Sequence, residues 1–305
     1  MNFWAGLTLS VVSILGMRYL AHVLILRGLR APRLPHLQSP ADQGYRCSEV
    51  LLPTARGQLF AWFVPSNSTG LSPAVVVMHG WGANASLMLP ALEPLHAAGY
   101  SVLLVDALCH GQSDGAAFTS LPRFTDDIAS GLDWLKQQPS VDLAHLAIMG
   151  HSVGAGAALL CATRRRDVRA VISMSAFAHP QDIMRSFLRE AHIPYPVVGW
   201  YVMRHVQRVI GARFDDIAPV NSIRQLHCPV LLVHGTEDSV VPVSDLHRLM
   251  QAGAAGQVQC LCVRGGHDPS ATFEAADLQA LTGFLQQALG LVHGTACSNP
   301  AAIKA

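Results

Sequence analysis

The chain has 305 residues, which is enough for one large α/β domain without a second full domain. Its 21 Lys and Arg balance 20 Asp and Glu, so a formal net charge of +1 gives no overall field that would attract nucleic acid. The seven cysteines are scattered without paired CxxC spacing, and the 15 histidines contain no HExxH pattern. We therefore expect free thiols, no catalytic metal and no cofactor.

Residues 1–30 form a hydrophobic segment that we interpret as a single-pass membrane anchor. Residues 3–17 carry no charge, a run slightly short of a full span that suffices if Arg18 snorkels to one interface. Three arginines between residues 27 and 33 flank the segment, and the positive-inside rule then predicts a cytoplasmic catalytic domain. A helix lying on the bilayer or packed on its own domain remains an alternative. A cleaved signal peptide is disfavoured because the basic n-region is missing.

Several prolines in residues 31–44 predict a linker, and residues 291–305 are expected to be a disordered tail. The folded domain is expected at 45–290. Short apolar runs predict strands at 48–52, 58–64, 74–78, 102–105, 143–149, 168–174, 230–233 and 258–263. Helices are predicted at 86–98 and 123–137. We expect the first two strands to form an antiparallel hairpin at a sheet edge, and the others a mostly parallel sheet with helices on both faces, an α/β fold.

The apolar run 146–149 breaks into Gly-His-Ser-Val-Gly and then into a helix rich in small residues. A serine at the tip of a sharp strand-to-helix turn needs small residues two positions away on either side, and Gly150 and Gly154 meet that need. The pattern alone is also common in ordinary turns. The strand before it and the small residues after it predict that Ser152 is a nucleophile.

Candidates for the two partners of a nucleophilic serine follow in the order acid, then base. Asp238 comes just after the apolar run 230–233, where a carboxylate can face the top of the sheet and accept a hydrogen bond from the Nδ1–H of a histidine. The neighbouring Glu237 remains an alternative acid. His267 follows in a Gly-rich loop after the last strand and is the candidate base.

The loop His79-Gly80-Trp81-Gly82 follows the strand at 74–78. Its glycines let the backbone turn, so that the N–H groups of Trp81 and Val153 can bind an oxyanion above the serine. Candidates for lining the substrate pocket are His79, His151, Tyr195, Trp200 and Tyr201.

These motifs together resemble the α/β-hydrolase family over residues 45–290. The order Ser, Asp, His and the HGxG loop are those of the family. The stretch 106–113 is similar to the family's D-x-R-G-H-G-x-S motif, although Leu108 and Cys109 stand where Arg and Gly are usual. This departure bears on the subfamily more than on activity.

The resemblance implies two-step acyl transfer, in which His267 takes the Ser152 proton and Asp238 holds the imidazole. The strand-to-helix turn at residues 150–154, called the nucleophile elbow, carries Ser and not Asp at its tip. Dehalogenase and epoxide-hydrolase chemistries, which use an Asp nucleophile there, are therefore disfavoured.

Roughly fifty residues separate the strand ending near 174 from the strand beginning near 230, more than one crossover helix needs. We expect residues 178–228 to form a small helical cap whose apolar side chains roof an acyl pocket or touch a bilayer. Packing of the cap onto the core accounts equally well for any single one of them.

The first hypothesis is a membrane-anchored serine hydrolase, esterase-like or lipase-like, that cleaves a carboxylic ester of a lipid-like or acyl substrate. The alternatives are an acyl-thioesterase similar to the protein depalmitoylases, an aminopeptidase-like hydrolase, and a non-catalytic binding module. The sequence does not separate the three enzyme classes, and it leaves the oligomeric state open.

Overall fold

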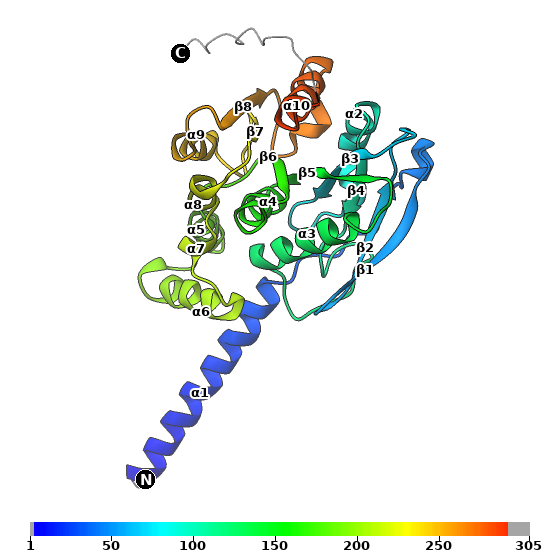
Figure 1. Cartoon of the computed structure of the whole chain (residues 1–305). Helices are drawn as coiled ribbons and strands as arrows, with labels where there is room; N and C mark the ends of the chain where they lie inside the picture. Colours follow the sequence, from blue (N-terminus) through cyan, green and yellow to red (C-terminus); the bar gives the residue numbers. More distant parts are fainter. Residues whose placement is uncertain (1–2, 292–305) are drawn as a thin grey trace.

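The computed structural model describes residues 3–291, and one eight-stranded sheet forms its centre (Figure 1). The strands run in the order β1-β2-β4-β3-β5-β6-β7-β8. β1 and β2 form an antiparallel edge hairpin, β2 pairs antiparallel with β4, and all other neighbours are parallel. The strands are β1 (Ser48–Thr54), β2 (Gly57–Val64), β3 (Ser72–Met78), β4 (Ser101–Val105), β5 (Val141–His151), β6 (Val168–Met174), β7 (Val230–Gly235) and β8 (Val258–Val263). The α/β fold and its edge hairpin are confirmed. The expected tail falls outside the described residues except at residue 291.

Helices cover both faces of the sheet, because alternate residues of the buried strands point to opposite sides. Val76 and Met78 pack with α3, α4 and α9 on one face, whereas Val75 and Val77 pack with α2 and α10 on the other. The helices of these two layers are α2 (Leu92–Ala97), α3 (Leu121–Leu135), α4 (Val153–Arg164), α9 (Val243–Ala252) and α10 (Ala275–Ala288). The carboxyl ends of the parallel strands lie together at one end of the sheet, whose central strands are covered on both faces.

The structure differs from the sequence prediction before α2. One helix was expected over 86–98, but the chain forms the 3₁₀ helix η2 (Ala85–Ala91) and then α2. Pro90 lies inside this stretch, lacks an N–H and clashes with a preceding carbonyl in a regular α-helix. The break in hydrogen bonding divides the expected helix in two.

Short helical elements fill the region between β6 and β7, where the cap was expected. They are α5 (Pro180–Glu190), the π-helical turn η3 (Tyr195–Gly199), α6 (Trp200–Ile210), α7 (Phe214–Ile217), α8 (Pro219–Ser222) and the 3₁₀ turn η4 (Ile223–Gln225). In Figure 1, α6 lies at the lower edge of the body, where the long N-terminal helix joins it.

That N-terminal helix, α1 (Phe3–Gly28), projects away from the body (Figure 1). Its stretch Thr8–Gly28 has a mean hydropathy of 1.8, and none of it is buried within the protein. By length and composition it is able to cross a membrane, although a signal sequence shares these properties.

The chain after α1 is held against the loops at the carboxyl ends of β3 and β4. The His36 Nε2 atom lies 2.8 Å from Asp106 Oδ2, and the His36 ring packs on Trp62 with centroids 4.4 Å apart. Asn84 donates to the Leu34 carbonyl at 3.0 Å. The expected linker region is thereby fixed to the sheet and keeps α1 in a defined position.

Asp127 on α3 supports one of those loops from within the core. Its Oδ2 atom accepts the Leu108 N–H at 2.9 Å, and its Oδ1 atom lies 3.4 Å from Arg56 Nη2. The residue has no exposed surface, and burial raises the pKa of its carboxyl to about 6. The folded protein therefore binds a proton here more tightly than the unfolded chain does.

This shift predicts a pH dependence of stability. A raised pKa means that the unfolding free energy falls as pH rises, by roughly 3 kcal/mol between about pH 4 and pH 6. Asp127→Asn keeps an oxygen for the Leu108 N–H but cannot titrate. We expect the unfolding free energy of Asp127→Asn minus that of wild type to increase from about pH 4 to pH 6, because only the wild type loses stability through this carboxyl over this range. Urea unfolding at several pH values measures both. The matched control is Asp126→Asn on the exposed neighbour, and an equal change in both variants would contradict the assignment.

Candidate active site

Ser152 stands at the turn between β5 and α4, with backbone angles φ 54° and ψ −116°. The turn brings backbone segments together so closely that two positions exclude any side chain. A Cβ at Gly150 would lie 2.3 Å from the Gly154 carbonyl oxygen, and a Cβ at Gly154 would lie 2.3 Å from the His79 carbonyl oxygen. The Gly-x-Ser-x-Gly pattern is thus a steric requirement of the turn.

The structure brings Ser152, His267 and Asp238 together from three separate loops. His267 Nε2 lies 3.0 Å from Ser152 Oγ, and His267 Nδ1 lies 2.9 Å from Asp238 Oδ2. The alternative acid, Glu237, has a side chain that is 68% exposed and lies 4.0 Å from Arg264. Asp238, and not Glu237, therefore contacts the imidazole.

The carboxylate of Asp238 is oriented by its own loop. Its Oδ1 atom accepts the N–H groups of Val240 and Val241, each at 2.8 Å. Burial opposes the charge, but hydrogen bonds from His267 and from these two amides outweigh it and lower the pKa of Asp238. An ionised Asp238 accepts a hydrogen bond from the Nδ1–H of His267, which leaves Nε2 unprotonated and free to accept the Ser152 hydroxyl proton.

His151 fixes the backbone of the His267 loop. Its Nε2 atom lies 2.8 Å from the His267 carbonyl oxygen, which only accepts, so Nε2 carries the proton. Burial lowers the pKa of His151 and keeps it neutral. A Cβ at Gly235 would lie 2.1 Å from the Gly266 carbonyl oxygen, so this glycine allows the same loop to approach β7. The sequence indicated neither role.

The HGWG loop lies directly over the serine. A Cβ at Gly80 would be 3.1 Å from the Cβ of Ser152. Among residues 3–291, the N–H groups of Trp81 and Val153 have no hydrogen-bond partner. The Val153 N–H also opens the N-terminus of α4, where the helix dipole favours negative charge. Both donors are available for a substrate oxygen, as the proposed oxyanion hole requires.

His79 itself is internal. It is fully buried, its Nδ1 lies 2.7 Å from the Gly80 carbonyl oxygen, and its Nε2 accepts the Ala107 N–H at 3.0 Å. Burial lowers the pKa of His79 to about 3, so the ring is neutral. This pocket candidate supports the loop from below and presents no surface to a ligand.

The three aromatic pocket candidates belong to the region of η3 and α6. Tyr195 accepts a hydrogen bond from Arg185 at 3.1 Å, and the Tyr201 ring stacks on His205 with centroids 5.7 Å apart. The Trp200 side chain is 55% exposed. Their contacts tie these residues to the cap, and their place in a substrate pocket stays a prediction.

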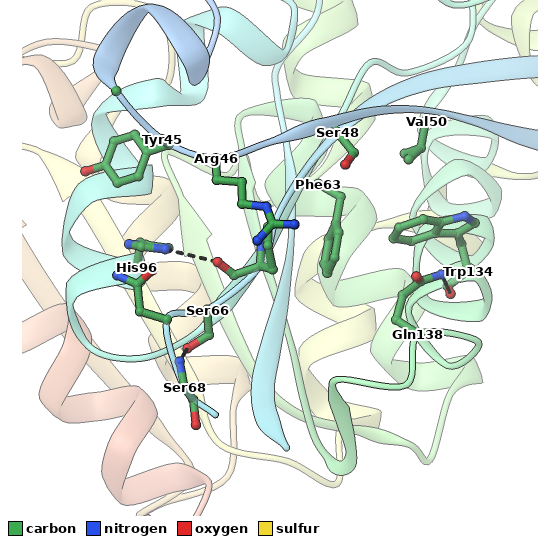
Figure 2. Close-up of a pocket in the computed structure, with 13 residues that line it drawn as sticks. Tyr45, Arg46, Ser48, Val50, Phe63, Ser66, Ser68, His96, Trp134 and Gln138 are labelled. Atoms are coloured by element: carbon green, nitrogen blue, oxygen red, sulfur yellow. Dashed lines mark hydrogen bonds between the residues drawn. The ribbon is translucent and has the colours of Figure 1, made fainter. Parts of the chain in front are cut away.

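A large open hollow of about 960 Å³ lies elsewhere, shown in Figure 2 with Tyr45, Arg46, His96 and Trp134 around it. It lies where β1 begins and β2 ends, beside the start of β4. That is the opposite end of the sheet from Ser152, so this hollow is separate from the candidate active site. In the described part of the chain, no group of three or more His, Cys, Asp or Glu side chains could hold a metal ion.

Known proteins resemble this chain in sequence and in fold. A family model described as serine aminopeptidase, S33, matches residues 71–213. The Mycobacterium tuberculosis protein Rv2307c is 29% identical over 241 residues, which cover 78% of this chain and 79% of the relative. YfhR of Escherichia coli K12 is 29% identical over 191 residues, covering 61% and 60%.

Solved structures show the same fold at low sequence identity. The Pyrococcus furiosus esterase Pf2001 superposes with a TM-score of 0.68 at 20% identity, covering 84% of this chain and 98% of the esterase. A Mycobacterium tuberculosis puromycin-hydrolyzing peptidase gives 0.62 at 21% identity, covering 81% and 40%. The neighbours thus include both an esterase and a peptidase.

The close packing around Gly150 and Gly154 predicts how much unfolding free energy is lost when one methyl group is added at either position. Gly150→Ala and Gly154→Ala force a Cβ onto a backbone oxygen, so we expect each to lower the unfolding free energy by more than about 2 kcal/mol. Gly283→Ala, in the exposed face of α10 with no atom within 4 Å, should raise it by about 0.5–1 kcal/mol. Urea unfolding of the full chain in detergent measures all three. Equal stability of the three variants would contradict the steric argument.

The contact between Asp238 and His267 predicts the reactivity of Ser152. Asp238→Asn should slow labelling of Ser152 by a fluorophosphonate by about 10³–10⁴-fold, because the imidazole loses the partner that sets its tautomer. Glu237→Gln, one residue away and exposed, is the matched control and should label at the wild-type rate. A large loss in the Glu237 variant instead would reverse the assignment of the acid.

Proposed function

We propose that this chain, a member of the α/β-hydrolase superfamily, is a serine hydrolase that cleaves a carboxylic ester of an acyl or lipid-like substrate. One observation carries the proposal. Ser152, His267 and Asp238 form a continuous hydrogen-bonded chain beside the free N–H groups of Trp81 and Val153. Nucleophile, base, acid and oxyanion donors are what acyl transfer through a serine requires.

Acylation follows from this geometry. His267 Nε2 takes the Ser152 proton as Oγ attacks the substrate carbonyl carbon, and Asp238 stabilises the resulting imidazolium. The carbonyl oxygen becomes an oxyanion held by the Trp81 and Val153 N–H groups, where losing one donor typically costs roughly 3 kcal/mol of transition-state stabilisation. His267 then protonates the leaving alcohol as the ester C–O bond breaks.

Deacylation repeats the same steps with water. His267 removes a proton from a water molecule, which attacks the acyl-enzyme carbonyl, and the collapse of the second oxyanion returns the proton to Ser152 Oγ. The products are a free acid and the regenerated serine. His151 keeps the imidazole in place through both halves because it holds the His267 carbonyl.

One observation favours an acyl ester over a peptide: the cap presents apolar side chains of the kind that contact an acyl chain. The fold itself is shared with the esterase Pf2001 and with a peptidase, so it does not separate these substrates. The match to the serine aminopeptidase model favours a second candidate, an aminopeptidase-like hydrolase with the same three residues. A thioesterase would use them unchanged.

We also propose that α1 anchors the enzyme in a membrane, with the catalytic domain on the cytoplasmic side. Three arginines between residues 27 and 33 follow the apolar stretch Thr8–Gly28, as the positive-inside rule expects for a cytoplasmic flank. Six cysteines in the described part of the chain are free thiols, which suits a reducing compartment.

Hydrolysis of a p-nitrophenyl acyl-ester series, from short to long chain, tests the substrate class. The full chain in detergent micelles should turn over these esters with kcat/KM rising with chain length, and Ser152→Ala should lose at least about 10³-fold. Matched acyl-thioesters and aminoacyl anilides serve as competing substrates. A preference for either, with Ser152 still labelled by fluorophosphonate, would keep the nucleophile and reject the ester.

A further inference from the structure

The cap carries an apolar surface that the protein itself does not cover. Its members come from α5, η3 and α6, are between 36% and 75% exposed, and include two aromatic residues of the kind that gather at membrane interfaces. We call this the cap surface, and it consists of Phe187, Tyr195, Val197, Val198 and Trp200.

Positive charge rims the cap surface. Residues 183–213 contain five arginines and one glutamate, and one of these arginines, Arg213, pairs with Asp215 at 3.4 Å. The Arg185 guanidinium lies 4.7 Å from the Tyr195 ring centroid, and that of Arg204 lies 5.9 Å from the Trp200 ring centroid. Within residues 3–291, neither Arg185 nor Arg204 pairs with a carboxylate. The surface therefore combines exposed aromatic rings with two arginines, Arg185 and Arg204, whose charges have no carboxylate partner in the described part of the chain.

The cap surface lies at the base of α1. His22 Nδ1 on α1 is 2.9 Å from His205 Nε2 on α6, and Figure 1 shows α6 where α1 joins the body. Because α6 contacts α1 at His22, the part of α1 left for a bilayer is Phe3–Leu20 rather than Thr8–Gly28. This part is about 27 Å long at 1.5 Å per residue, close to the thickness of a bilayer's hydrocarbon core. A bilayer that holds this stretch thus has its surface at the level of α6.

We propose that the cap surface docks on the headgroup region of the same bilayer that holds α1, with a preference for anionic lipids. Trp and Tyr are favoured at that depth, and arginines near an anionic surface are attracted to it. A second copy of the chain is a poorer occupant, since a symmetric pairing would bring two arginine-rimmed faces together. Docking rests on the proposed anchoring of α1, but it requires no catalytic step and is independent of the proposed hydrolysis.

Quenching of Trp200 in vesicles tests the docking. The full chain is reconstituted into phosphatidylcholine vesicles containing phosphatidylglycerol, with or without bromines on the acyl chains. The wild-type spectrum minus that of Trp200→Phe isolates Trp200, and α1 is the same in both proteins. We expect bromination to lower this difference by at least about twofold, because Trp200 would lie at the boundary between the headgroups and the acyl chains.

Trp134→Phe is the matched control, because Trp134 lines the hollow at the far end of the sheet (Figure 2). Its difference spectrum should be unchanged by bromination. An unquenched Trp200, or equal quenching of Trp134, would overturn the proposal. If Trp200 is unquenched and the reconstituted chain also cross-links as a dimer through α6, the cap surface is instead an interface with a second copy of the chain.

The charge preference has its own readout. Replacing phosphatidylglycerol with neutral lipid should reduce the quenching of Trp200, and the double variant Arg204→Glu, Arg208→Glu should reduce it in anionic vesicles. Both arginines are exposed and lie outside the candidate active site, so fluorophosphonate labelling of Ser152 in detergent should be unaffected and reports the folded state. If Trp200 is quenched equally in neutral and in anionic vesicles, the proposed contribution of the arginines is wrong.

Discussion

The backbone of Ser152, held at φ 54°, is the constraint on which the rest of the site depends. Residues other than glycine rarely adopt a positive φ, and this backbone conformation persists only where surrounding contacts fix it. Here β5, α4 and the His79 carbonyl approach so closely that Gly150 and Gly154 leave no room for a Cβ. The same crowding lifts the serine hydroxyl above the sheet edge, where the loops after β7 and β8 bring Asp238 and His267 to it.

The loops around the serine are supported by histidines that must remain neutral. His79 accepts the Ala107 N–H, and His110 accepts the Gly82 N–H at 3.1 Å, so each ring locks the loop after β3 to the loop after β4. Burial lowers the pKa of both, and a protonated ring would lose its accepting nitrogen. The HGWG loop therefore owes its position to buried, uncharged imidazoles and needs no contact with substrate to stay in place.

The sequence predicted the sheet, the elbow and the three residues Ser152, His267 and Asp238, of which His267 links the other two. Each of these features has a local signature: an apolar run, a pair of glycines, or a polar residue directly after a strand. The prediction failed where the determinant was distant in the chain. The bond from His151 to the His267 carbonyl spans 116 positions. Cys109, where the family pattern has glycine, adopts φ 73° all the same, since its loop is fixed by neighbours such as Asp127. Pro90 is an exception, because it is a local signal: a single helix was nevertheless expected over 86–98, and the structure divides it.

The segment after α1 connects the proposed anchor to the proposed oxyanion loop. Pro32 lies against Gly82, where a Cβ would come within 3.0 Å of its ring, and Asn84 holds the Leu34 carbonyl. Because His36 also contacts Asp106, this segment is bound to the same loops that surround Ser152. With α1 in a bilayer and the cap surface on its headgroups, these contacts would keep the serine at a fixed height above the membrane. An acyl chain leaving the bilayer would then travel a constant path to the nucleophile, which is a physical reason for proposing a lipid-like ester rather than a soluble peptide.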